Sequence, residues 1–162
     1  MAGAICEAGP TSFHVEQTEA HCVFRRANSW FALPAAAVRE VLFRPEIVAV
    51  PFSSEMITGL CHLRSEFLAV VNLDGLLSDD AAGYLSERKM IVVNGPEGPW
   101  ALLVDEVDVL AVLETNAVSD PGRRGDIVNA VVARAVHGSH VVQVLDPDRL
   151  YDAAGRDRSV EE

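Results

Sequence analysis

Short runs of apolar residues, separated by turn-forming residues, follow one another along most of the chain. Each run is near the usual strand length of about five residues. The breaks between runs lie at Ala27-Asn28, around Arg64-Ser65, and over 94–99 and 137–140. Short strands with regular turns are typical of small barrels rather than of a parallel sheet covered by helices. The pattern therefore predicts a mainly β protein with roughly ten strands.

One convincing helix is predicted within this pattern, over Ala35 to Leu42. Pro34 suits a first helical turn, good helix formers follow it, and Pro45 limits the far end. A last helical turn is expected to start at Asp146-Pro147 and to run through Tyr151. The fold class expected is thus β, with one or two short helices.

The two ends of the chain show no hydrophobic periodicity. Residues 1–18 mix small and polar types, and residues 152–162 are small and charged. Segments of this kind are usually poorly ordered. We therefore predict flexible tails at both ends and a folded body over residues 19–151.

A weak internal repeat divides this body. Trp30-Phe31-Ala32-Leu33 recurs as Trp100-Ala101-Leu102-Leu103, and the run 70–73 is echoed over 142–146. Two similar halves suggest two like barrels packed together. The alternative interpretation is that any two Val-rich hairpins look alike.

Charge and cysteine content narrow the possible partners. The chain has 162 residues, with 24 acidic against 13 basic side chains and a net charge of −11. Nucleic acids and anionic membranes bind basic protein surfaces, whereas this chain is acidic. No apolar run approaches the ~20 residues that span a bilayer. Cys6, Cys22 and Cys61 show no paired spacing, which is typical of a reducing compartment. We expect a cytoplasmic protein that binds other proteins, with no nucleic-acid partner and no membrane insertion.

The sequence carries no catalytic or nucleotide-binding motif: it has neither a nucleophile elbow nor a glycine-rich phosphate loop. His137 and His140 flank a two-residue turn, but no third metal ligand lies near them in sequence. His62 lies in an apolar run and is interpreted as a structural histidine. In the acidic cluster of Asp105, Glu106 and Asp108, strand alternation puts Glu106 and Asp108 on one outer face, which is interpreted as a strand face in water. We expect a binding module that is not an enzyme and uses no metal or cofactor.

Four ordered motifs resemble those of the CheW-like family. They are Val38-Arg39-Glu40-Val41-Leu42, Gly59-Leu60-Cys61-His62-Leu63-Arg64, Val104-Asp105-Glu106-Val107, and the closing segment 141–150. The resemblance implies two five-stranded SH3-like β-barrels packed around a shared core, with chain segments that can interleave. It also implies a non-enzymatic adaptor, which couples the cytoplasmic tips of chemoreceptors to the regulatory domain of a CheA-type histidine kinase.

The resemblance further implies a set of protein-binding residues: Val38, Glu40, Gly59, Leu60 and Arg64. Glu40 and Arg64 are expected to form an ion pair beside the receptor-binding face. Structural interpretations remain open for each residue. Val38 and Leu60 can simply be packed, Gly59 can serve a backbone conformation, and the ion pair can merely orient a turn.

Several positions depart from the family pattern. Ser65 replaces a glycine, Ala69 a proline and Asn72 an aspartate, and the segment 118–127 is short. Without the glycine, the turn must adopt an ordinary conformation or carry strain. The departures suggest an accessory paralogue with altered receptor or kinase binding. The alternative function is a small-molecule-sensing β-barrel module whose ligand enters between the two barrels.

Overall fold

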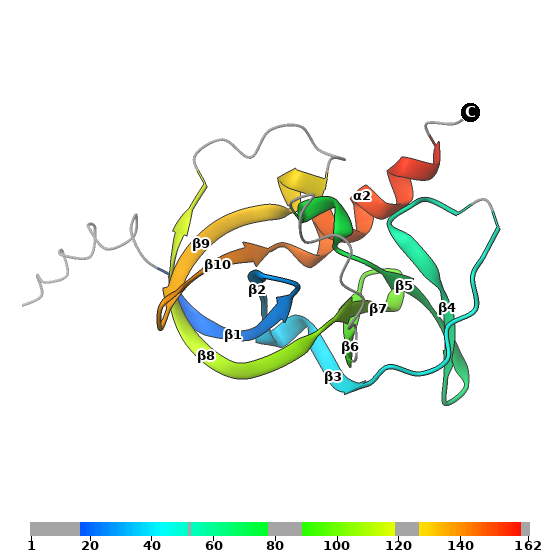
Figure 1. The fold of residues 1–162 in the computed structure, drawn as a ribbon, viewed down its shortest axis with the longest axis horizontal. Coiled ribbons are helices and arrows are strands. Elements are labelled where there is room, and N and C mark those ends of the chain that lie inside the picture. The colour runs from blue at the N-terminus through cyan, green and yellow to red at the C-terminus, as the bar shows by residue number, and fades with distance from the viewer. Residues whose placement is uncertain (1–16, 52, 78–88, 119–126, 160–162) are drawn as a thin grey trace, which may run out of the picture.

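The residues that the structure describes form ten strands in two five-stranded units (Figure 1). The structure is a computed structural model and describes residues 17–51, 53–77, 89–118 and 127–159. The strands are β1 (Gln17–Arg26), β2 (Ser29–Pro34), β3 (Val38–Phe43), β4 (Ile57–Leu63), β5 (Glu66–Val71), β6 (Lys89–Gly95), β7 (Gly98–Val104), β8 (Glu106–Ala117), β9 (Val131–His137) and β10 (His140–Leu145). The first barrel is closed, in the order β1-β2-β10-β9-β8, and the second sheet has the order β3-β6-β7-β5-β4. The mainly β fold class is confirmed.

Two hairpins, β1–β2 and β6–β7, are buried on both faces. In the first hairpin, Phe24 and Phe31 pack into a core shared by both units, whereas Val23 and Ala32 point into the first barrel. The second hairpin alternates in the same way between the shared core and the interior of the second sheet. Burial on both faces requires near-continuous apolar runs, which explains the composition of these four strands.

The repeat in the sequence is a repeat of topology, and its two halves exchange their opening hairpins. Each half supplies a hairpin followed by three strands, and each hairpin pairs with the three strands of the other half. Strand β2 thus lies parallel to β10, and β7 lies parallel to β5. Because of this exchange, neither unit corresponds to one half of the chain, and the interleaving implied by the family resemblance is present.

The structure shifts the alignment of the repeat by one residue. Ala32 pairs with Val144 in the first barrel, and Ala101 pairs with Val70 in the second sheet. Phe31 is therefore the counterpart of Trp100, and both side chains are buried in the shared core. The alignment of Trp30 with Trp100 was wrong. Phe31 is the residue of the first hairpin that is buried in the shared core at this position, and Trp30 packs against the first-barrel core instead.

The predicted helix over Ala35 to Leu42 is also wrong. Only Ala35–Ala37 forms a short 3-10 helix, η1, and the chain then continues as β3. Strand β3 pairs antiparallel with β6, and its side chains alternate between part-buried and exposed positions. Tertiary pairing along β6 thus overrides the helix propensity of this segment.

The C-terminal segment is a helix, α2 (Pro147–Ser159), so the prediction of a flexible tail from residue 152 is wrong through Ser159. The Asp146 side chain caps the helix by accepting the backbone N–H groups of Asp148 and Arg149 at 2.9 and 3.3 Å. Spaced along one helix face, Leu150, Ala153 and Ala154 are buried. These contacts tie α2 to the protein, with Leu150 and Ala154 packed in the shared core.

At the other end, β1 begins at Gln17, slightly before the predicted start of the body. The rest of the predicted N-terminal tail, residues 1–16, lies outside the described residues, as do 160–162. Two further 3-10 helices, η2 (Asp74–Leu76) and η3 (Ile127–Ala130), follow β5 and precede β9. None of the helices in the described ranges is both long and apolar enough to cross a membrane.

Candidate functional site

Glu40 and Arg64 form the ion pair that the family motif led us to expect. Glu40 lies on β3 and Arg64 in the β4–β5 turn. The guanidinium donates to both carboxylate oxygens, with Nη1 to Oε2 at 2.6 Å and Nη2 to Oε1 at 2.9 Å. The hydrogen bond from Arg64 is the main cause of a lowered pKa at Glu40, and the carboxylate in turn raises the pKa of Arg64. Both groups are therefore held in their charged forms.

Further charges extend this pair across the open side of the second sheet. Strands β3 and β4 are the two edges of that sheet, and no ladder joins them. Arg39 on β3 donates to Glu66 on β5 at 3.2 Å, and its Nε lies 3.9 Å from Glu40. Side-chain ion pairs thus connect β3 to the β4–β5 hairpin where backbone pairing is missing. We call Arg39, Glu40, Arg64 and Glu66 the charged corner.

The turn beneath the charged corner has an unusual backbone. Arg64 has φ +57°, in the left-handed region that disfavours side chains with a Cβ. The corresponding turn of the first barrel places Gly138, with φ +62°, at the matching position. The structure therefore puts the positive φ on Arg64, and Ser65 is not among the described residues with positive φ. With the backbone in this conformation, the Arg64 side chain makes its bidentate contact with Glu40.

Gly59 allows two chain segments to approach closely. Val48, in the connection after β3, exchanges two backbone hydrogen bonds with Leu60, at 2.8 and 2.9 Å. A Cβ built at Gly59 would overlap the carbonyl oxygen of Val48. The backbone interpretation of Gly59 is thus supported, with a close approach rather than a positive φ as the cause. Val38, by contrast, is part-buried against the shared core, which favours its packing interpretation.

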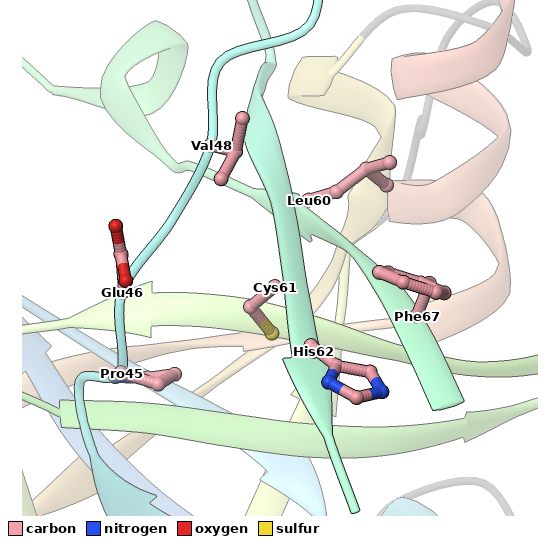
Figure 2. A pocket seen from close by; sticks show the side chains of 7 residues that line it. All are labelled: Pro45, Glu46, Val48, Leu60, Cys61, His62 and Phe67. Carbon is pink, nitrogen blue, oxygen red and sulfur yellow. The ribbon is translucent and has the colours of Figure 1, made fainter. Parts of the chain in front are cut away.

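Leu60 lies beside a shallow hollow on the outer side of the second sheet. Figure 2 shows the side chains that line it, from the β3–β4 connection and from β4 and β5. The cavity has a volume of about 370 Å³. Leu60 is 37% exposed, so ordinary core packing does not account for it. The lining residues are Pro45, Glu46, Val48, Leu60, Cys61, His62 and Phe67.

His62 lies on the outside of this hollow rather than in the core. It is exposed, and its ring stacks on that of Phe67 with centroids 4.6 Å apart. The sequence predicted a structural histidine within an apolar strand, but the alternation of β4 turns the His62 side chain outward. The neighbouring Cys61 is buried, and burial raises the pKa of its thiol, as it does for Cys22. Both are free cysteines.

Each unit exposes several apolar side chains that the sequence did not predict, and we call each set an apolar patch. The two patches occupy matching positions: Val41 pairs with Ile91 of the β6–β7 hairpin as Leu110 pairs with Cys22 of the β1–β2 hairpin. An apolar patch of this kind often marks a protein-binding surface. The signal in the sequence was a strand with apolar residues on both faces. The second-sheet patch comprises Val41, Phe43, Val48, Leu60 and Phe67, and the first-barrel patch comprises Leu110, Val112, Val136 and Val141.

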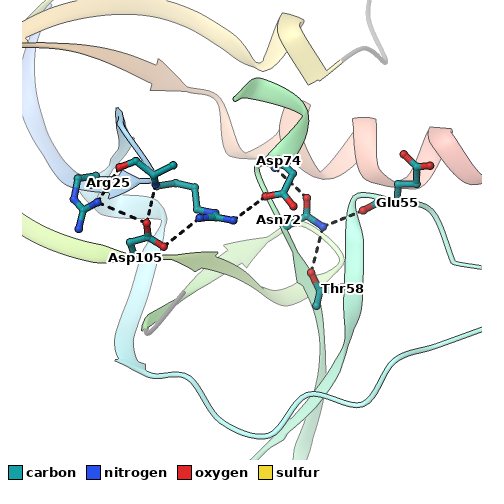
Figure 3. Close-up of polar contacts among 8 residues, drawn as sticks. Arg25, Glu55, Thr58, Asn72, Asp74 and Asp105 are labelled. Carbon is teal, nitrogen blue, oxygen red and sulfur yellow. Dashed lines mark hydrogen bonds and ion pairs between the residues drawn. The ribbon is translucent and has the colours of Figure 1, made fainter. Parts of the chain in front are cut away.

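A buried ionic network lies where the two units meet. Arg26, at the end of β1, is fully buried and contacts Asp105 at 3.3 Å and Asp74 at 3.2 Å. Asp105 is 2% exposed and also accepts the backbone N–H of Ala27 at 2.7 Å. In Figure 3, Asp105 lies beside Arg25, and Asp74 lies farther along the network next to Asn72. Glu106 and Asp108 are exposed, in agreement with the expected strand face in water, whereas Asp105 is buried because the chain crosses between the two units at this point.

Asn72, a departure from the family pattern, has a structural role beside this network. Its amide nitrogen donates to the Glu55 carbonyl at 2.9 Å and to the Thr58 hydroxyl at 3.2 Å (Figure 3). Its oxygen accepts the backbone N–H of Asp74 at 3.1 Å. An ionised aspartate at this position could accept the hydrogen bond from the backbone N–H of Asp74, but it could not donate one to the Glu55 carbonyl. The asparagine therefore ties the β3–β4 connection to the end of β5. The short segment 118–127 lies mostly outside the described residues.

The fold defines the class of protein: two interleaved five-stranded β units joined by a common core. The sequence profile of the CheW-like domain family matches residues 21–155, and the chain belongs to that family. Members of this family are scaffold and adaptor proteins rather than enzymes. The SH3-like arrangement expected for both units is confirmed by a structural match.

Two similar proteins illustrate the relationship. The chain is 29% identical over 84 residues to Protein PilI of Pseudomonas aeruginosa. The match covers 52% of this chain and 47% of PilI. The chain therefore spans about half the length of that relative. The crystal structure of the scaffolding protein TtCheW from Thermoanaerobacter tengcongensis has the same fold, with a TM-score of 0.68. That match has 20% sequence identity and covers 86% of this chain and 91% of the other.

Proposed function

We propose that this protein is a cytoplasmic, non-enzymatic adaptor that couples the tips of chemoreceptors to the regulatory domain of a CheA-type histidine kinase. The charged corner carries the proposal, because it holds Glu40 and Arg64, the two charged residues that match the family motif, in a bidentate pair on the surface. In this role, the corner and the adjacent Leu60 bind the receptor, and Gly59 allows the close backbone approach of Val48 that places Leu60.

An adaptor needs separate surfaces for separate partners, and the chain offers them. The second-sheet patch adjoins the charged corner, whereas the first-barrel patch lies on the other unit. In the second-sheet patch, Phe67 is 71% exposed, and in the first-barrel patch Val141 is 61% exposed. We assign the first-barrel patch to the kinase regulatory domain, since it is distinct from the receptor surface.

The receptor assignment can be tested with a variant that respects the backbone of the turn. Arg64→Gly removes the guanidinium while relieving the positive φ, so it separates loss of contact from backbone strain. We expect this variant to bind a receptor-tip fragment more weakly, by about tenfold or more, because a charged hydrogen bond is lost. Arg134→Ala removes one positive charge from an exposed position of β9 and is the matched control. Equal receptor affinity for Arg64→Gly and the wild type would refute the assignment.

The kinase assignment is tested with serine substitutions in the two patches. Val141→Ser is expected to weaken binding of the isolated kinase regulatory domain and to leave receptor binding intact. Phe67→Ser is expected to do the reverse, since it lies beside the charged corner. Pull-down and calorimetry with each partner measure these effects. If the wild-type protein bound neither partner, the adaptor proposal itself would fail.

The alternative of a ligand between the two barrels receives less support. In the described part of the chain, buried side chains of both units meet there, among them Phe31, Trp100 and Leu145. Two cavities that are lined by described residues lie on the second sheet and at one end of the first barrel.

A further inference from the structure

The first barrel becomes polar toward one end. Along β1, Val23 points into the barrel core, and alternation puts His21 and then Glu19 on the same face. On β8, Leu113 likewise lies in the barrel core, and Thr115 follows on the same face. These polar residues line a cavity of about 350 Å³ whose floor includes Ala133 and Val144 of the barrel core. The mouth of a β-barrel is a common place for a ligand.

His21 presents an unused acceptor to this cavity. The residue is 3% exposed, and its Nδ1 lies 2.9 Å from the carbonyl oxygen of Glu19. A carbonyl only accepts hydrogen bonds, so Nδ1 is the donor. In the neutral ring, Nε2 then carries the lone pair, and it has no hydrogen-bond partner among the described residues. Because His21 lines the cavity, this nitrogen can accept a hydrogen bond from a ligand that carries a donor.

The rim of the cavity is acidic. Glu19, Asp146 and Asp148 line it, and none of its lining residues is a lysine or an arginine. Asp146 is engaged in capping α2, which leaves the exposed carboxylates of Glu19 and Asp148 to face a ligand. In the described part of the chain, no three His, Cys, Asp or Glu side chains converge closely enough to hold a metal ion. The chemistry therefore favours an organic cation with N–H donors.

We propose that the mouth of the first barrel binds an amino or guanidinium group, either of a free small amine or of a basic side chain on a protein partner. The group donates one hydrogen bond to Nε2 of His21, and its positive charge pairs with Glu19 and Asp148. The alkyl part of the ligand packs against the apolar floor at Ala133 and Val144. This site is separate from the charged corner and from both apolar patches.

Two probes distinguish the sources of the cation. Agmatine represents a free amine, and a blocked Gly-Arg-Gly peptide represents an arginine side chain. We would titrate each into the isotope-labelled full chain and follow the amide and His21 ring signals. We expect saturable shifts that are concentrated at residues 19–21 and 144–148. Equal affinity for both probes would identify a site for free amines, and tighter binding of the peptide a site for a partner's side chain; both results support the proposal.

Variants test the individual contacts. The amide nitrogen of Asn occupies the place of Nδ1, so His21→Asn keeps the bond to the Glu19 carbonyl and removes Nε2. We expect this change, and Glu19→Gln combined with Asp148→Asn, each to weaken binding about tenfold or more. Glu114→Gln, on the outer face of β8, removes the same charge away from the mouth and should leave binding unchanged.

Three results would overturn the proposal. They are absence of saturable shifts with either probe, equal loss of binding in Glu114→Gln, and binding of Zn²⁺ at the same signals without any binding of amines. Each variant's near-ultraviolet circular dichroism and melting temperature would be recorded first. If His21→Asn were to unfold the protein, the two carboxylate changes alone would decide the matter.

Discussion

Removal of Asp105 should destabilise the junction between the two units strongly. Asp105 is 2% exposed and faces Arg26, whose side chain is completely buried. Arg26 pairs with both Asp105 and the half-exposed Asp74. Asp105→Ala removes the first of these two carboxylates and also removes the acceptor of the Ala27 N–H. Loss of one partner from a buried ion pair typically costs about 3–5 kcal/mol in the free energy of unfolding. This is a large part of the ~5–15 kcal/mol that stabilises a typical domain.

The assay is urea unfolding together with thermal unfolding, both followed by circular dichroism. At ~2–4 °C per kcal/mol for a chain of this size, the melting temperature of Asp105→Ala should fall by about 6–20 °C. Asp105→Asn can keep an acceptor for the Ala27 N–H but removes the charge, so it should retain only a small part of the lost stability. Asp108→Ala changes an exposed carboxylate nearby and should shift the free energy by no more than about 0.5 kcal/mol. A cost for Asp105→Ala similar to that for Asp108→Ala would refute the reasoning.

Three further predictions concern the second sheet and α2. Gly59→Ala should lower the free energy of unfolding by about 1–3 kcal/mol in urea, because the added methyl overlaps a backbone carbonyl. Gly155→Ala, whose Cβ meets open space on α2, should be neutral or slightly stabilising, and equal costs for the two would contradict the close-approach argument. The Arg64 guanidinium lowers the pKa of Glu40, so the ion pair stabilises the fold above the ordinary Glu range and is lost as pH falls through the lowered pKa. Arg64→Gly should therefore raise the pKa of Glu40 in an NMR titration, and an unchanged value would exclude the pair in solution. Deletion of residues 152–162 should lower the melting temperature by several degrees because part of α2 is buried, whereas loss of only the last three residues should not; equal melting temperatures would contradict the packing of α2.

The candidate surfaces were only partly predictable. The pairing of Glu40 with Arg64 followed from the family motif, and the structure places the two side chains in contact. The apolar patches were not predicted, because a valine on a strand gives no sign of whether its face is covered by another element. The buried network around Arg26 was missed for a related reason: its partners lie 48 and 79 residues away in the sequence.

The sequence by itself determined where the chain forms strands and turns. Short apolar runs and turn residues act locally, so the turns at Ala27-Asn28 and Arg64-Ser65 could be predicted before any pairing was known. The repeat likewise indicated two similar units. What the sequence could not determine was which half of the chain supplies which strand, since hairpins β1–β2 and β6–β7 are apolar on both faces and could pair with either set of strands.

Only the tertiary structure decided that the halves exchange their hairpins. Parallel pairing of β2 with β10 and of β5 with β7 joins segments that lie far apart in the chain. The same long-range pairing makes β3 a strand despite its helical propensity, and the shared core holds α2 as a helix where local composition favoured a loose tail. Burial against distant segments contributes more free energy than local propensity, which is why these features were decided by the assembled fold.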